Sequence, residues 1–302
     1  MTSIAIMNAK GGVGKSTLTM AIAETLAVFH NKSVLLIDAD AQMNLSLMLM
    51  PPEALTESKK AGRSLAAWLA GNVLGYARTD WRECVIGGIS DVDDARSLAI
   101  MPGDMDMTFV EREIAAKSAL MRARQACRRL LDEAEEFVDF VMADCPPGIS
   151  VITECWLREC DWHLIPIKPD ILAVSGMEYL RRFRTQNPQL GFAAHLGVLI
   201  NMKDTRSPID QMTHEYLSKE SDLRCFASAI PMIGHIQKAA LFVREERSYQ
   251  NKYPGAAGQA LRDVTAEILE RISAEAVPEP EILPEPEAVP EPADAPPASV
   301  EP

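Results

Sequence analysis

The chain has 302 residues, 47% of them hydrophobic, which is enough to bury the core of one large α/β domain or two small ones. It has no run of about 18 apolar residues, no basic n-region leading into an apolar run, and no C-x-x-C pair among its six cysteines, so we expect a cytoplasmic protein with reduced thiols. The net charge is −13, but residues 275–302 supply −8 of it, so the remaining −5 neither indicates nor excludes binding to nucleic acid.

Short apolar runs alternate with longer amphipathic stretches along the body of the chain. The runs predict strands at 3–8, 33–38, 97–101, 137–144, 162–167, 195–200 and 225–230. The periodic stretches predict helices at 16–29, 108–136 (with a possible break), 151–160, 172–185, 209–219 and 256–272. Nearly continuous apolar strands that alternate with helices are typical of an α/β fold, a mostly parallel twisted sheet flanked by helices on both faces.

Two segments stand apart from this alternation. Residues 51–96 are polar and Gly-rich with two Trp, and we expect an excursion on the same domain. Residues 274–302 hold nine prolines among Glu, Ala and Val, a composition that cannot bury enough apolar surface to offset the entropy of ordering. We therefore expect one domain over residues 1–273 and a disordered acidic Pro/Glu-rich tail over 274–302.

The strongest motif is Ala9-Lys10-Gly11-Gly12-Val13-Gly14-Lys15-Ser16-Thr17. It follows a predicted strand and opens a predicted helix, the context that a P-loop requires. Glycines let backbone N–H groups turn toward phosphate oxygens, and the helix N-terminus adds its positive dipole end. Lys15 would reach the β- and γ-phosphates, Ser16 would bind Mg²⁺ and Thr17 would contact the α-phosphate. The motif therefore predicts an ATP site with Mg²⁺, although Ala9 replaces the first Gly of the strict pattern.

Acidic residues end two of the predicted strands. Asp38 and Asp40 follow the second strand, and Asp144 ends the strand predicted at 137–144. Carboxylates at the carboxyl ends of parallel strands point into the ligand crevice of such a sheet. We expect Asp144 to hold Mg²⁺, and Asp38 and Asp40 to address the metal or the attacking water.

Together these motifs resemble the ParA/MinD family of P-loop ATPases, and the ParA branch most of all. The extra Lys10 looks like the deviant Walker A motif of that family, residues 38–44 (DADAQMN) resemble its D-x-D-P-Q-G-N switch, and residues 144–148 resemble its D-C-P-P-x strand end. Weaker similarities occur at residues 98–103, 164–168, 197–201 and 229–231. The resemblance spans roughly residues 1–272. Ala41 and Met43 depart from the Pro and Gly that are usual in the switch.

The resemblance implies a mechanism and partners. Two ATP-loaded protomers would pair face to face, and Lys10 of one would contact the phosphates bound by the other. Lys10, Lys15 and Asp40 would be catalytic, with Asp40 orienting water and Asp38 supporting Mg²⁺. Asn201 and Pro231 would contact adenine. Hydrolysis would be slow without a stimulating partner protein, ParB-like or a cargo adaptor.

A ParA-like dimer would also hold DNA non-specifically, which predicts association with the nucleoid. Arg181, Arg182 and Arg184 are candidate phosphate contacts because they cluster in one predicted helix far from the P-loop in sequence. No membrane role is expected, because the C-terminus is acidic and Pro-rich rather than a basic amphipathic helix.

Two other functions remain open at this point. An ATP-dependent ligase on the same fold would need a second substrate pocket with general bases or Arg side chains beside the γ-phosphate. A pure interaction protein would have a degenerate nucleotide site, which does not agree with intact Lys15, Ser16, Asp40 and Asp144.

Overall fold

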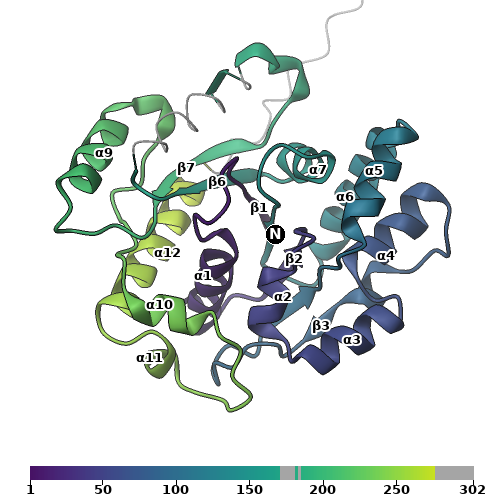
Figure 1. The fold of residues 1–302 in the computed structure, drawn as a ribbon, viewed down its shortest axis with the longest axis horizontal. Coiled ribbons are helices and arrows are strands. Elements are labelled where there is room, and N and C mark those ends of the chain that lie inside the picture. The colour runs from purple at the N-terminus through teal and green to yellow at the C-terminus, as the bar shows by residue number, and fades with distance from the viewer. Residues whose placement is uncertain (171–180, 183–184, 276–302) are drawn as a thin grey trace, which may run out of the picture.

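A seven-stranded sheet organises the part of the chain that the computed structural model describes, residues 1–170, 181–182 and 185–275 (Figure 1). Its strand order is β3-β4-β2-β5-β1-β6-β7, and only β3 runs antiparallel to its neighbour. The strands are β1 (Thr2–Ile6), β2 (Val34–Asp38), β3 (Ile86–Gly87), β4 (Leu98–Met101), β5 (Phe140–Asp144), β6 (Trp162–Ile167) and β7 (Ala194–Ile200). The predicted α/β fold with a mostly parallel sheet is confirmed.

Helices cover both faces of this sheet. One face carries α1 (Lys15–His30), α2 (Asn44–Leu49), α10 (Gly234–Ala239), α11 (Tyr249–Lys252) and α12 (Ala256–Ala274). The other carries α4 (Leu65–Leu69), α5 (Met107–Ala116), α6 (Leu120–Ala134) and α7 (Val151–Glu159). Two further helices are α3 (Pro52–Lys60) and α9 (Pro208–Lys219). No helix that the structure describes is both long enough and apolar enough to span a membrane.

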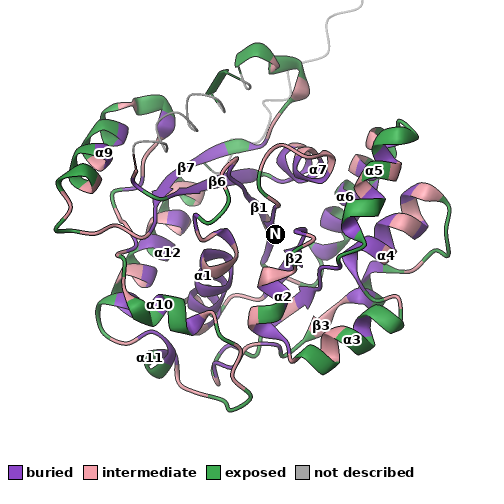
Figure 2. Ribbon diagram, in the orientation of Figure 1, coloured by how far each residue is buried: buried purple, intermediate pink, exposed green. Residues whose placement is uncertain are grey.

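The strands are buried on both faces, as their apolar composition requires (Figure 2). In β1, Ile4 and Ile6 pack in the core shared with α1 and α12, whereas Ala5 packs in the core shared with α6 and α7. Successive side chains of a strand point to opposite faces, so an alternating sequence would expose one face to water.

Most predicted elements are present, and one predicted strand is not. The helix predicted at 108–136 is two helices, α5 and α6, which are separated near Ser118, a residue with φ of 49°. The excursion at 51–96 contains α3, α4, a π-helical turn (Ala70–Leu74) and the edge strand β3. The strand predicted at 225–230 is wrong. The helix predicted at 172–185 falls mostly outside the described residues.

The segment 225–230 is apolar because it anchors a loop. Phe226 N donates to Val198 O at 2.9 Å, and Ile230 N donates to Ile200 O at 2.8 Å. Four residues of this segment therefore span two residues of β7, and the chain bulges away between them instead of forming a ladder. The Arg271 guanidinium lies 3.9 Å from the centre of the Phe226 ring and donates to the carbonyl oxygens of Arg224 and Cys225.

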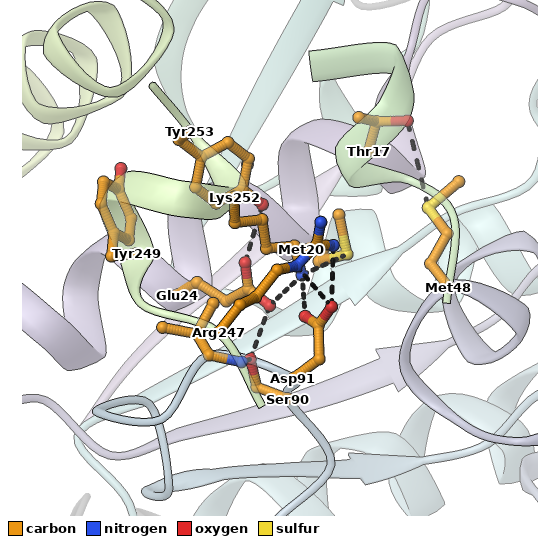
Figure 3. A network of polar contacts seen from close by, with 12 residues as sticks. Thr17, Met20, Glu24, Met48, Ser90, Asp91, Arg247, Tyr249, Lys252 and Tyr253 are labelled. Carbon is orange, nitrogen blue, oxygen red and sulfur yellow. Dashed lines mark hydrogen bonds and ion pairs between the residues drawn. The ribbon is translucent and has the colours of Figure 1, made fainter. Parts of the chain in front are cut away.

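A buried charge network joins α11 to α1 (Figure 3). Lys252 Nζ lies 2.7 Å from Glu24 Oε1 and 2.5 Å from Asp91 Oδ1, and the Lys252 and Glu24 side chains have no exposed surface. Arg247 pairs with Asp91 at 2.7 Å, and Tyr253 Oη donates to Glu24 Oε2 at 2.7 Å. Two cations face two carboxylates, so the network balances its formal charge inside the protein.

Candidate nucleotide site

The P-loop connects β1 to α1, and hydrogen bonds with two asparagine side chains hold it in place. Asn8 accepts from the Lys10 backbone N–H at 2.8 Å and donates to Pro166 O at 2.6 Å. Asn201 Nδ2 donates to Val13 O at 2.8 Å. Gly14 has φ of 87°, and a Cβ there would lie 2.3 Å from Asn201 Nδ2, so residue 14 must be glycine for the loop to close.

Gly14 is also the N-cap of α1, and no side chain caps this helix. The first backbone N–H groups of α1 therefore remain available, as an anion site at a helix N-terminus requires. Lys15 and Ser16 begin the helix, and Lys15 is buried, with 7% of its surface exposed. Thr17 Oγ1 lies 4.0 Å from Met48 Sδ on α2 (Figure 3). The loop residues Gly11, Gly12 and Val13 lie directly before this helix end.

Asp144 ends β5 in the position that the sequence predicts for a metal ligand. Its carboxylate is buried, and neither oxygen has a hydrogen-bond partner within the described residues. Burial raises the pKa of Asp144 well above its usual range, the charge of Asp38 raises it further, and nearby Ser16 and Lys15 act in the opposite direction. An unpaired buried carboxylate beside a serine hydroxyl offers the oxygen ligands that Mg²⁺ prefers, so these residues fit the ion.

Asp38 lies directly beside Asp144 in the sheet, but its contacts differ. Asp38 Oδ2 accepts from the backbone N–H of Ser46 at 2.8 Å and from its hydroxyl at 2.6 Å, while Oδ1 accepts from Asp40 N at 3.3 Å. Burial raises the pKa of Asp38 to about 6, against the effect of the Ser46 hydrogen bonds. In this structure Asp38 therefore holds the switch segment, and its support of Mg²⁺ stays a prediction.

Asp40 lies in the switch loop between β2 and α2 and is also buried. Its carboxylate accepts from Gln42 N at 2.9 Å, and its carbonyl oxygen accepts from Met43 N at 2.9 Å. Met43 has φ of 55°, a left-handed conformation that glycine adopts more readily than a residue with a side chain, and glycine is the residue that the resembled switch motif has here. Ala41, the other departure, follows Asp40 in the same loop.

Lys10 has a partner that the sequence does not predict. Its Nζ lies 2.7 Å from Oδ2 of Asp170, which follows β6, and the two side chains are 41% and 33% exposed. Lys10 thus lies at the open rim of the loop, while Lys15 is buried.

The predicted adenine contacts lie side by side. Lys203, two residues after Asn201, forms an isolated parallel bridge with Pro231. Asn201 is buried under the loop and its amide group is already bonded to Val13. A nucleotide base contact by these two residues stays a prediction.

The predicted DNA contacts are only partly described. Arg181 is paired with Asp222 at 2.9 Å and with Glu220 at 3.5 Å, which reduces the positive charge that it presents. Arg182 is exposed, and Arg184 lies outside the described residues.

Sequence reasoning missed Ser46, Gly103 and Asp170. Ser46 and Gly103 contact Asp38 from other elements, and their spacing from it, 8 and 65 residues, matches no motif. Gly103 did carry a signal, because it lies two residues after β4 and within the stretch 98–103 that resembles the family, and a glycine beside a strand is common where backbones approach closely.

Comparison with known proteins agrees with this geometry. A family model described as an AAA domain matches residues 1–190. The chromosome partitioning protein ParA of Caulobacter vibrioides is 26% identical over 279 residues, which cover 89% of this chain and 94% of that protein. Cobyrinic acid a,c-diamide synthase from Mycobacterium smegmatis with bound ATP analog and magnesium has the same fold, with a TM-score of 0.70, 20% identity and coverage of 91% and 96%. So does pNOB8 ParA bound to nonspecific DNA, with a TM-score of 0.68, 21% identity and coverage of 91% and 99%. The chain therefore belongs to the ParA/MinD family of P-loop ATPases, which hydrolyse ATP.

Proposed function

We propose that this chain is an ATP-dependent dimerising switch of the ParA type. In this proposal, two protomers pair through their ATP sites, the dimer binds DNA non-specifically, and hydrolysis, stimulated by a partner protein, releases it. The cycle would position or segregate DNA or another cellular cargo, with the protein associated with the nucleoid. The chromosome partitioning function of the Caulobacter vibrioides relative supports this reading.

The position of Lys10 is the observation that carries the proposal. A P-loop needs one lysine for its own phosphates, and Lys15 at the start of α1 is placed for that role. Lys10 instead lies at the rim with its side chain 41% exposed, and its ammonium group would reach the phosphates of a second molecule by leaving its ion pair with Asp170. A cation supplied in trans stabilises the charge of a transferred phosphoryl group, as an arginine finger does.

Within one protomer, four side chains would share the remaining work. Lys15 would bind the β- and γ-phosphates, and Asp40 would orient the attacking water. Ser16 and Asp144 would hold Mg²⁺. When bound, the ion supplies positive charge at the phosphate oxygens. The backbone N–H groups of the loop would hold the phosphates in place.

The experiment that tests this function is binding to a random-sequence DNA duplex at low and moderate salt. Wild type and Lys10→Ala would be compared with ATP, with ADP and without nucleotide. We expect wild type to bind only with ATP and to lose affinity steeply as salt rises, because phosphate contacts release counterions. Lys10→Ala should bind ATP but not DNA.

Two results would count against the proposal. ATP-independent DNA binding would separate DNA affinity from dimerisation. Absence of DNA binding in every nucleotide state, with ATP still bound, would favour a protein-only switch or an ATP-dependent ligase. Stimulation of turnover by a small carboxylic acid would then identify the ligase.

A further inference from the structure

We propose that Ser46 is a positioning residue for ATP hydrolysis, which acts by closing the loop that carries Asp40. This inference rests on the proposed role of Asp40 and adds a residue to that site. Ser46 lies in α2, is fully buried, and makes no hydrogen bond to the P-loop in the part of the chain that the structure describes. Its effect on the reaction must therefore pass through its neighbours.

The hydrogen bonds of Ser46 tie both ends of the switch loop to one carboxylate. Asp38, where β2 ends, precedes the loop, and Ser46 follows it. The Ser46 backbone N–H and hydroxyl both donate to Asp38 Oδ2, at 2.8 and 2.6 Å. Residues 39–45 therefore form a loop that is closed at its base by two hydrogen bonds to a buried, charge-bearing acceptor, the stronger kind of hydrogen bond.

A third element locks this closure. The hydroxyl of Ser46 accepts from Gly103 N at 2.9 Å, so its own proton is committed to Asp38. Gly103 follows β4 and approaches so closely that a Cβ there would lie 3.0 Å from Asp38 Cγ. The strands β2 and β4 are neighbours in the sheet, which makes Gly103 a rigid support for the serine.

Inside the closed loop, hydrogen bonds continue to Asp40. Asp40 N donates to Asp38 Oδ1 at 3.3 Å, and the Asp40 carboxylate accepts from Gln42 N at 2.9 Å. The position of the Asp40 carboxylate thus depends on the same closure that Ser46 makes. A catalytic group that is displaced by about 1 Å can cost up to about 100-fold in rate, so loss of the closure should lower kcat.

The test is a double-mutant cycle on ATP turnover, with nucleotide affinity measured separately. We expect Ser46→Ala to lower kcat about tenfold and to leave the Kd for ATP within about twofold of wild type. Ser46→Thr, which keeps the hydroxyl, should restore most of kcat. In an Asp40→Ala background, Ser46→Ala should cause no further loss, because its effect passes through Asp40.

The outcomes separate this inference from the function that it rests on. Wild-type kcat in Asp40→Ala would overturn the role of Asp40 itself. A large loss in Asp40→Ala with wild-type kcat in Ser46→Ala would overturn the inference alone, as would a further loss in the double variant. If Ser46→Ala does not fold, Gly103→Ala replaces it, since its Cβ would crowd Asp38 while Ser46 stays in place. Unchanged kcat in a folded Gly103→Ala protein would also overturn the inference.

Discussion

Asp38 and Asp144 place two carboxyl groups side by side in the interior of the sheet. They end neighbouring strands in register, and burial raises the pKa of both, with a further increase from the charge of Asp40 for Asp38 and from the charge of Asp38 for Asp144. Such a pair destabilises the folded protein whenever both groups are charged, and a bound cation relieves that repulsion. Without a bound cation, the pair therefore lowers the free energy of unfolding, and binding of a metal-nucleotide complex would offset this loss.

A pH-dependent stability follows from Asp38. Its pKa is 3.8 in the unfolded chain and about 6 in the folded one, so the folded state binds more protons between these values. The stability contribution is present below pH 3.8 and is lost as pH rises to about 6, by about 3 kcal/mol at most. In the absence of nucleotide, the free energy of unfolding of Asp38→Asn should therefore increase relative to that of wild type as pH rises across this window. Urea unfolding measures the difference.

Asp139 provides the matched control. The backbone N–H of Ser33, together with its hydroxyl, lowers the pKa of Asp139 below 3.8, so the stability that this carboxylate contributes is lost as pH falls below 3.8 and levels off above it. The difference in unfolding free energy between wild type and Asp139→Asn should therefore level off above pH 3.8, where the difference for Asp38→Asn grows. Parallel stability curves for wild type and Asp38→Asn would show that the Asp38 carboxyl titrates in the same way in both states.

Met43 offers a second prediction at a single residue. A left-handed conformation costs a residue with a side chain about 1–2 kcal/mol, of which glycine regains part after its own loss of entropy. Met43→Gly should therefore be about 0.5–1 kcal/mol more stable than Met43→Ala, which removes the same side chain but keeps the cost of φ. Thermal unfolding of the two variants measures the difference, and equal stabilities would exclude strain at this position.

At the scale of elements, the strands were predictable and the excursion was not. Each parallel strand is an apolar run between polar loops, and Trp162–Ile167 matches its prediction to the residue. The helices of the region 51–96 are short. For example, α4 has five residues and is followed directly by a π-helical turn. No helical period can show over such a length. The P-loop and its acids were predictable because each follows a strand, whereas Ser46 and Asp170 reach the site only through folding.

The buried charge network that joins α11 to α1 gives the prediction at the scale of elements. Lys252→Met should destabilise the protein by about 3–5 kcal/mol, because Glu24 and Asp91 would keep buried charges with one cation between them. Adding Glu24→Gln should recover part of this loss. Urea unfolding measures both, with Arg96→Met as the control, since the Arg96–Glu246 pair is exposed on both sides and should contribute less than about 1 kcal/mol.

At the scale of the whole molecule, the residues of the candidate site lie together at one edge of the sheet, formed by the carboxyl ends of its parallel strands. The P-loop follows β1, Asp38 ends β2, Asp144 ends β5, Asp170 follows β6 and Asn201 follows β7. Parallel strands bring their carboxyl ends together, so residues far apart in sequence meet there. The Lys10–Asp170 pair lies at this edge and is partly exposed, as the proposed contact between two protomers requires.

This pair predicts a restraint on dimerisation. In the proposed dimer, Lys10 cannot contact the partner's phosphates while it is held by Asp170 of its own chain, so we expect Asp170→Asn to strengthen the proposed ATP-dependent dimerisation. Partly exposed ion pairs contribute about 0–1 kcal/mol, which limits the gain to about fivefold in the dimer Kd. Sedimentation with a non-hydrolysable ATP analogue would measure it. Lys10→Ala should abolish the gain in the double variant, because without the lysine there is nothing to release. A weaker dimer in Asp170→Asn would instead show that Asp170 supports the interface.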